Sequence, residues 1–210
     1  RIALKASIQA GKTTPDPNAL SVAIHADLTR FQCLTCHARD GLGGVPAALE
    51  DRFTTTEPDL GRQARIPPPL DGVGAKLRLE WLQRIIHDGE GVRPYMVTRM
   101  PAYSQEGPTQ LPQRLQEHDR AHSALTAQAF VEPANNEERK TLREGGRQLV
   151  GSEGLQCITC HRFNGQPSPQ FQGMDLIAMP ERLQPDWFQA FLLDPTAFRP
   201  GIVMPAYWPG

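Results

Sequence analysis

The feature that most constrains this chain is the pattern C-x-x-C-H, which occurs twice and uses all four cysteines of the sequence. It covers residues 33–37 and again residues 157–161 of the 210-residue chain. A chain of this composition would contain the pattern by chance only about 0.002 times. The sequence therefore predicts two equivalent sites, and any fold for this chain has to place both of them.

The spacing within the pattern suits the covalent attachment of haem. Two thiols about one helical turn apart can each form a thioether with one vinyl group of the same porphyrin, and the histidine that follows can bind the iron from one face. The pattern thus predicts two haem c groups and two bound irons. Their protein anchors are Cys33, Cys36 and His37 in the first half, and Cys157, Cys160 and His161 in the second.

Other uses of paired cysteines fit this sequence less well. A structural zinc site uses two cysteine pairs about 15–20 residues apart, whereas 120 residues separate the pairs here. A thioredoxin-like redox pair would need a preceding strand and no histidine. Two local disulfides would leave both histidines unexplained. Haem attachment is the reading that uses every residue of the pattern.

The two halves of the chain match beyond the cysteines. Each half has a leucine followed four residues later by tryptophan, then an Arg-Pro pair, and then the tetrapeptide Met-Pro-Ala-Tyr. Matched residues lie 124 positions apart at the cysteine pattern and 104–106 positions apart further on, so the order is kept while the first half carries insertions. Repetition on this scale predicts two copies of one domain. We expect a first domain at residues 1–115, a linker at 116–136 and a second domain at 137–210.

Each copy is predicted to be helical. Apolar residues from Leu20 to Phe31 recur at helical spacing before the first pattern, and Asn135 with Glu138 forms a capping box before the second. A later helix is expected at about residues 76–87, with Gly89 as its stop. Its counterpart in the second copy begins at Pro185, because proline is favoured at the first helical position. No convincing strand pattern occurs.

Methionine is the expected ligand on the far side of each iron. Met100 and Met204 occupy matched positions before Pro-Ala-Tyr, and the proline restricts the backbone that holds the sulfur. A thioether opposite histidine raises the reduction potential and closes the iron to small molecules. Met96, which has no matched partner, is a rival for the first haem, and Met174 and Met179 are weaker rivals for the second.

Four further residues are candidates for contact with the haem groups. Trp81 and Trp187 are expected to be core residues that also lie beside a haem, with the indole N–H facing a propionate. Arg93 and Arg199 precede the methionine segments and can pair with propionates. Solvated charges before a turn are an equally good interpretation of the two arginines.

The two patterns together resemble a known family. C-x-x-C-H with a trailing Met-Pro-Ala-Tyr, present twice between residues 18 and 208, resembles two tandem class I c-type cytochrome domains, similar in layout to cytochrome c4. The resemblance implies an all-α fold in which each domain is a small helical shell around one covalently bound haem. Family domains close with a helix after the methionine loop, so a second domain that ends six residues after Met204 is expected to lack it. The stretch from Met174 to Pro209 also resembles cytochrome modules at the ends of large exported bacterial dehydrogenase-like proteins, and we expect a fragment of such a protein.

Charge and hydropathy limit the partners and the location. The net charge is −1, with 22 Lys+Arg against 23 Asp+Glu, and no basic block occurs, so we expect no nucleic-acid binding. No apolar run reaches the roughly 18 residues needed to cross a bilayer, so we expect no membrane span. Because bacteria attach haem covalently outside the cytoplasm, the resemblance implies a periplasmic or otherwise exported protein.

These observations predict an electron carrier, not an enzyme. Each iron would exchange single electrons with redox partner proteins, a donor dehydrogenase and an acceptor cytochrome or oxidase. The alternative is a haem enzyme such as a dihaem peroxidase, which needs one iron with an open sixth position and acid–base residues above it. A ligand-sensing module would need an open position as well.

Overall fold

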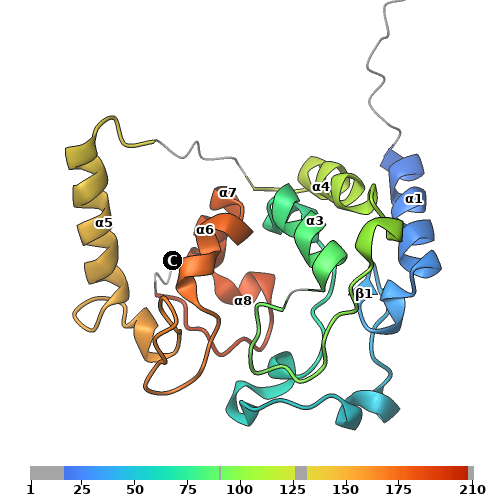
Figure 1. Ribbon diagram of the computed structural model, residues 1–210, viewed down its shortest axis with the longest axis horizontal. Coiled ribbons are helices and arrows are strands. Elements are labelled where there is room, and N and C mark those ends of the chain that lie inside the picture. Colours follow the sequence, from blue (N-terminus) through green and yellow to red (C-terminus); the bar gives the residue numbers. More distant parts are fainter. Residues whose placement is uncertain (1–16, 90, 126–131, 208–210) are drawn as a thin grey trace, which may run out of the picture.

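A computed structural model of the chain describes residues 17–89, 91–125 and 132–207 (Figure 1). Parts of the predicted first domain, linker and second domain (residues 1–16, 90, 126–131 and 208–210) lie outside the described residues. The helices are α1 (Pro17–Arg30), α2 (Val73–Lys76), α3 (Leu79–Asp88), α4 (Leu111–Ala121), α5 (Asn136–Val150), α6 (Met179–Arg182), α7 (Pro185–Leu193) and α8 (Pro195–Phe198). Short 3-10 helices are η1 (Cys33–Thr35), η2 (Ala47–Arg52), η3 (Pro58–Ala64), η4 (Ser104–Glu106), η5 (Cys157–Thr159) and η6 (Leu176–Ala178).

The described chain is mostly helical, which confirms the helical part of the fold prediction. A hairpin of two two-residue strands, β1 (Ala38–Arg39) and β2 (Leu42–Gly43), is the only sheet among the described residues, and the sequence pattern did not reveal it. No described helix combines the length and apolar character needed to cross a membrane.

In the first half, the core lies where α1 meets α4. Ile24 and Leu28 of α1 and Leu111 and Leu115 of α4 are almost fully buried in one cluster. Helix α2 crosses α4 at Gly74, where an added Cβ would lie 2.1 Å from the carbonyl oxygen of Leu115. The predicted domain boundary at residue 115 therefore falls inside α4, a helix that is packed on the first half.

A buried ion pair fixes the other end of α4. Asp119 accepts hydrogen bonds from the Arg39 guanidinium at 2.5 Å and from the backbone N–H of Gly74 at 2.8 Å. Both charged side chains are buried. This pair joins the β1–β2 hairpin next to the first cysteine pattern to α2 and α4.

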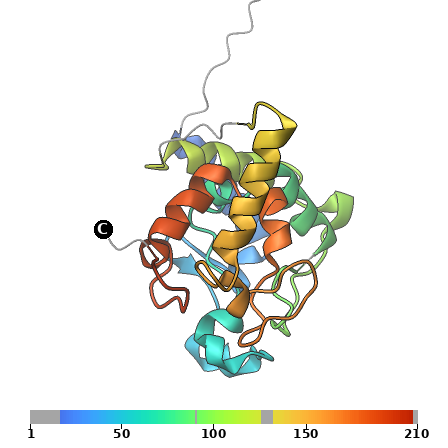
Figure 2. The same ribbon diagram turned by 90° about the vertical axis from the view of Figure 1, so that its left-hand side faces the viewer.

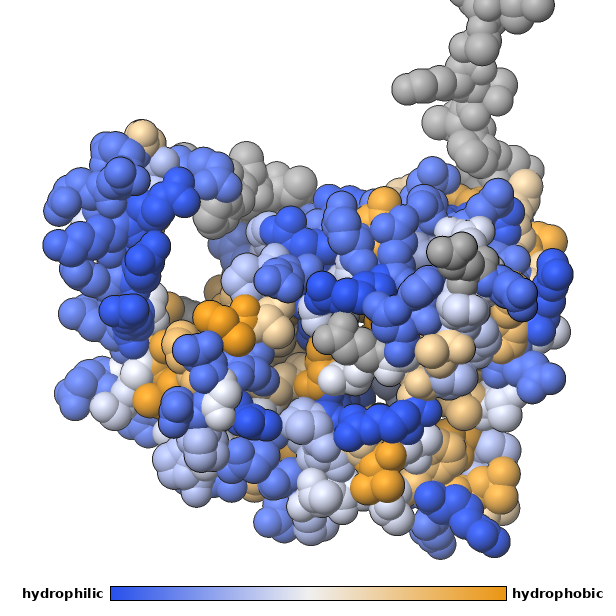
Figure 3. Space-filling model, viewed as in Figure 1, coloured by the Kyte–Doolittle hydropathy of each residue, from blue (hydrophilic) through white to orange (hydrophobic). Residues whose placement is uncertain are grey.

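In the second half, α5 stands on the outside of the molecule. The N-cap is confirmed, because the Asn135 side chain accepts from the Glu138 N–H at 2.9 Å. The reciprocal bond of a capping box is shifted by one residue, because the Glu138 carboxylate accepts from the N–H of Ala134 at 2.7 Å and not from that of Asn135. The apolar residues of this helix remain open to solvent, with Leu142 56% and Leu149 47% exposed. Figure 2 views the molecule from this side, with α5 in front, and Figure 3 shows α5 at the left edge with a largely hydrophilic surface.

The two halves meet through matching segments. Helices α2 and α3 of the first half correspond to α6 and α7 of the second at an offset of 106 residues, and α3 lies beside α6 and α7 (Figure 1). The Arg78 N–H donates to the Arg182 carbonyl at 3.0 Å, and the Gln184 N–H donates to the Lys76 carbonyl at 2.9 Å. Because 76 matches 182 and 78 matches 184, these bonds are related by an approximate two-fold axis.

The residues around this axis form one shared core. Leu77 and Leu183, which are matched residues, form a bridge across the axis. The buried cluster around them contains equal contributions from both halves: Leu77, Trp81 and Leu82, and Met179, Leu183 and Trp187. Both predicted tryptophans therefore lie in the core, and that core belongs to the contact between the halves.

Candidate functional site

The two cysteine patterns adopt the same backbone conformation. Each begins a 3-10 helix, η1 or η5, after a glutamine in the left-handed region, with φ of 57° at Gln32 and 55° at Gln156. The N–H of His37 donates to the Cys33 carbonyl at 2.9 Å, and the equivalent bond from His161 has the same length. A left-handed non-glycine residue costs roughly 1–2 kcal/mol. The structure carries this cost at the same position in both halves.

All four cysteines are free and half-buried. Burial raises the pKa of Cys33 above its usual value, and it does the same for Cys157 and Cys160. These thiols are therefore protonated at neutral pH. Two free thiols in one short turn are what two thioether bonds to a single porphyrin require.

The two histidines are held in the same way. The Nδ1 atom of His37 donates to the Pro68 carbonyl at 2.7 Å, and Nδ1 of His161 donates to the Met174 carbonyl at 2.9 Å. A carbonyl oxygen can only accept, so Nδ1 carries the proton and Nε2 keeps its lone pair. Metal-binding histidines usually have this arrangement. Burial lowers the pKa of His37, which keeps its ring neutral and able to bind a metal.

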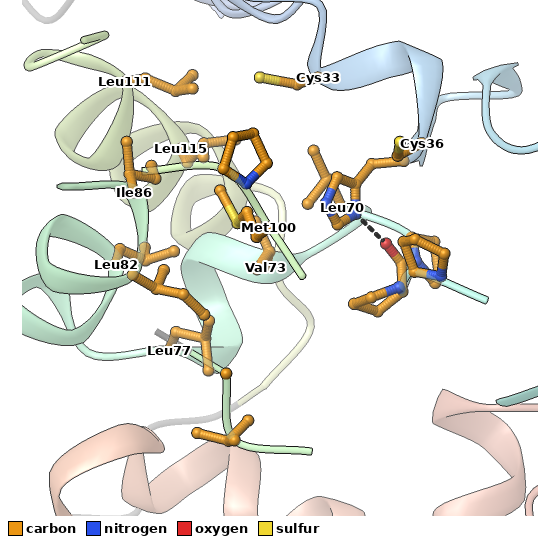
Figure 4. A pocket seen from close by; sticks show the side chains of 18 of the residues that line it. Cys33, Cys36, Leu70, Val73, Leu77, Leu82, Ile86, Met100, Leu111 and Leu115 are labelled. Carbon is orange, nitrogen blue, oxygen red and sulfur yellow. Dashed lines mark hydrogen bonds between the residues drawn. The ribbon is translucent and has the colours of Figure 1, made fainter. Parts of the chain in front are cut away.

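A cavity of about 260 Å³ lies next to the first pattern. Cys33, Cys36 and His37 line it together with Met100. Figure 4 shows the two cysteines on one side, apolar side chains of α3 and α4 on the other, and Met100 between them. Most of the remaining lining is apolar and includes Leu28, Leu70, Val73, Leu77, Leu82, Ile85, Ile86, Leu111 and Leu115.

The segment that carries Met100 is fixed at both ends. Gly89 ends α3 in the left-handed conformation, and a Cβ there would lie 2.6 Å from the Met100 carbonyl oxygen. The N–H of Tyr103 donates to the Ile86 carbonyl at 3.1 Å, and its hydroxyl donates to the Phe31 carbonyl at 2.9 Å. The Met-Pro-Ala-Tyr segment thus spans from the end of α3 to the residues just before the first cysteine pattern.

The matched segment of the second half also reaches its cysteines. Met204 is half-buried. The pKa of Tyr207 is raised by burial and then by the charges of Cys157 and Cys160, just as burial and Cys33 raise that of Tyr103. Met-Pro-Ala-Tyr therefore lies beside C-x-x-C-H in both halves.

The other methionines occupy different positions. Met96 is buried against Ala64 and Tyr95 and also lines the first cavity, so two thioethers face the same space. Met179 belongs to the core between the halves. Met174 supplies the carbonyl that holds His161. Among these three methionines, only Met96 lines the same cavity as Met100.

Trp81 and Trp187 are buried beside cationic side chains. The Arg84 guanidinium lies 4.3 Å from the ring centroid of Trp81, and the Lys76 ammonium lies 4.5 Å from that of Trp187. The indole Nε1 of Trp81, a residue that lines the first cavity, has no hydrogen-bond partner within the described residues. This donor is available to an acceptor bound in the cavity.

The structure brings Arg93 and Arg199 close together and adds two cations that sequence reasoning missed, Lys76 and Arg182. Burial and the charge of Arg93 lower the pKa of Arg182 and of Arg199 to about 10. Burial, followed by the three arginine charges, lowers the pKa of Lys76 well below its usual value. The signal in the sequence was that Lys76 and Arg182 occupy matched positions one residue before the paired leucines.

No group of three or more His, Cys, Asp or Glu side chains that could hold a metal ion occurs in the part of the chain that the structure describes. Haem iron needs only one ligand of these types, and each half presents one histidine for it. Comparison of the chain with family models, curated proteins and solved structures finds no match. The functional assignment accordingly rests on the geometry of the site.

Proposed function

We propose that this chain is a dihaem c-type cytochrome, or the cytochrome module of a larger exported protein, that carries single electrons between redox partners. The observation that carries this proposal is the matched geometry of the two patterns. Each places two free thiols in one 3-10 turn and holds a histidine by Nδ1, so that Nε2 keeps its lone pair. A structural role alone would not require this combination twice.

The residues present fit the group. In the first half, Cys33 and Cys36 would hold the porphyrin, and His37 and Met100, which line the same cavity, would bind the iron. In the second half, Cys157, Cys160, His161 and Met204 would take the same roles. When bound, each haem supplies a one-electron Fe(III)/Fe(II) couple.

The protein's contribution is to set the surroundings of that couple. The apolar lining of the first cavity excludes water, and His/Met ligation favours the reduced iron and a higher potential. The carbonyl bonds to Nδ1 fix the imidazole orientation and increase its basicity. The buried Trp81 N–H and the nearby cations are suited to the carboxylate edge of the porphyrin.

We further propose that the protein works outside the cytoplasm, with a dehydrogenase as electron donor and a cytochrome or oxidase as acceptor. The support for this location is the chemistry of covalent haem attachment that the motifs imply.

An anaerobic redox titration of the purified holoprotein tests the electron-carrier role. We expect the chain to take up two electrons, one per haem, in reversible one-electron steps, with no binding of carbon monoxide to the untreated ferrous form. Uptake of a single electron, or carbon monoxide binding by the untreated protein, would contradict the proposal. The variant Cys33→Ser/Cys36→Ser is the matched control and should take up one electron.

A further inference from the structure

The contact between the halves brings a cation of the second half to the site of the first. Arg182 belongs to α6 of the second half, yet it lines the cavity that contains His37 and Met100. Lys76 of α2 lines the same cavity, and its ammonium also lies over the ring of Trp187 in the second half. Figure 4 shows the second half passing beside the cavity near Leu77.

This arrangement follows from the approximate two-fold axis. Residues 76 and 182 are matched at the offset of 106, and each supplies the carbonyl that accepts a bond from the opposite half. The side chains that leave the backbone at these two positions therefore start at the axis itself. Lys76, Arg93 and Arg182 line one cavity, and Arg199 is the fourth cation of the cluster, because its charge, like those of Arg93 and Arg182, lowers the pKa of Lys76.

The cluster has no compensating negative charge among the described residues. Arg182 is 6% exposed and Arg93 is 7% exposed, and neither forms an ion pair with a described carboxylate. The Nε atom of Arg182 has no hydrogen-bond partner there, and Arg93 makes one long bond of 3.5 Å to the Gln63 carbonyl. Buried charges without partners are costly, by several kcal/mol per ion as a rough scale. An anionic ligand next to the cluster would remove that cost.

We propose that Arg182 acts across the interface and binds a carboxylate of the haem that is anchored in the first half. The inference rests on the proposed function, because haem carries two carboxylates that have to be accommodated at its site. Arg93 and Lys76, which line the same cavity, serve this haem from the first half. The first half then does not hold its cofactor with its own charges alone, and the potential of the first haem depends on a residue of the second half.

The test uses full-length holoproteins that carry one haem each, so that every potential has a known origin. Cys157→Ser/Cys160→Ser keeps the first haem, and Cys33→Ser/Cys36→Ser keeps the second. Into each background we would introduce Arg182→Met, Lys76→Met and, as a matched control, Arg143→Met on the exposed helix α5. Spectroelectrochemistry then gives the potential of the single haem.

Removing a cation next to a haem carboxylate favours the ferric state. Arg182→Met is expected to lower the reduction potential of the first haem by at least about 59 mV. For one electron, this shift corresponds to a tenfold change in the equilibrium constant for reduction. Lys76→Met should also lower the potential of the first haem, Arg182→Met should change that of the second haem less, and Arg143→Met should leave both unchanged. Arg182→Lys, which keeps the charge, should restore most of the shift.

Two results would overturn this inference while leaving the proposed function standing. One is a first-haem potential that changes no more in Arg182→Met than in Arg143→Met. The other is a full-length Arg182→Met protein that loses both haems equally, whereas selective loss of the first haem would support the inference. Absence of covalent haem from both single-haem proteins would instead contradict the proposed function itself.

Discussion

At the scale of the residue, the hydrogen bond on Nδ1 determines what each histidine can do. His37 and His161 donate to carbonyls of residues 31 and 13 positions further along the chain, so the loops that follow the cysteine patterns fix both rings. The pattern in the sequence identified these histidines, but it contained no information on which loop residue would hold them. The structure determines the methionine ligand of the first iron less strictly than the histidine, since both Met96 and Met100 line the same cavity.

Met100→Ala is expected to open the first iron. The ferrous protein should then bind carbon monoxide at one haem, and the oxidised spectrum should lose half of the weak charge-transfer band at its red end that accompanies methionine ligation. Met96→Ala, which removes the neighbouring thioether, should change neither property. If Met96→Ala opened the iron and Met100→Ala did not, the ligand assignment would be reversed.

Gly89→Ala is expected to disturb the same ligand through the backbone. A Cβ at this position would lie 2.6 Å from the Met100 carbonyl oxygen, whereas at Gly72 it would meet nothing within 4 Å. Both glycines are left-handed, with φ of 66° and 62°. Gly72→Ala should therefore cost only the backbone strain of roughly 1–2 kcal/mol. Gly89→Ala should lower the free energy of unfolding by more than this, as chemical denaturation would measure. It should also weaken the charge-transfer band that accompanies methionine ligation. Equal losses of stability with an unchanged band would be evidence against this contact.

At the scale of the element, local signals in the sequence predicted several helix ends, although the helix expected from about residue 76 begins at Leu79, because Lys76 ends the separate helix α2. Asn135 with Glu138 begins α5, Pro185 begins α7, and Gly89 follows the last residue of α3, because capping and the special backbone of these residues act over a few positions. The contacts between elements were not predictable in this way. The Arg39–Asp119 pair joins residues 80 positions apart, and nothing in the local sequence connects them.

The Arg39–Asp119 pair gives a prediction about α4. Asp119→Ala leaves a buried guanidinium unpaired and the Gly74 N–H without its acceptor, so the free energy of unfolding should fall by about 3–5 kcal/mol. Glu181→Ala removes an ion pair at 3.7 Å between the exposed Glu181 and Arg84 side chains, and should cost less than about 1 kcal/mol. Urea denaturation of the two variants would measure both changes, and similar losses would show that burial does not decide the cost.

At the scale of the whole molecule, the sequence repeat predicted two copies but not how they meet. Leu77 and Leu183, which form a bridge at the axis, belong to the matched pattern, but a matched pattern does not show whether its two copies touch. A repeat shows that two segments share a fold, and only the structure shows that they face each other. The first cavity and the cation cluster both include residues from the two halves.

The shared core predicts that the halves stabilise each other. Leu183→Ala, at a residue that is 5% exposed between the halves, should lower the free energy of unfolding by about 2–5 kcal/mol. Because Leu183 packs against Leu77 and Trp81, the loss should also appear in the unfolding of the first half. The visible absorption of the first haem would monitor this transition. Leu149→Ala on the exposed side of α5 is the control. An unaltered first-half transition in Leu183→Ala would show that the halves unfold independently.

The mass of the denatured polypeptide tests the central claim, two porphyrins bound covalently through the four cysteines, most directly. After production in a bacterial host that attaches haem outside the cytoplasm, we expect a polypeptide heavier than its sequence by two haem groups, and by one in Cys157→Ser/Cys160→Ser. A colourless protein with the mass of the bare chain would contradict it.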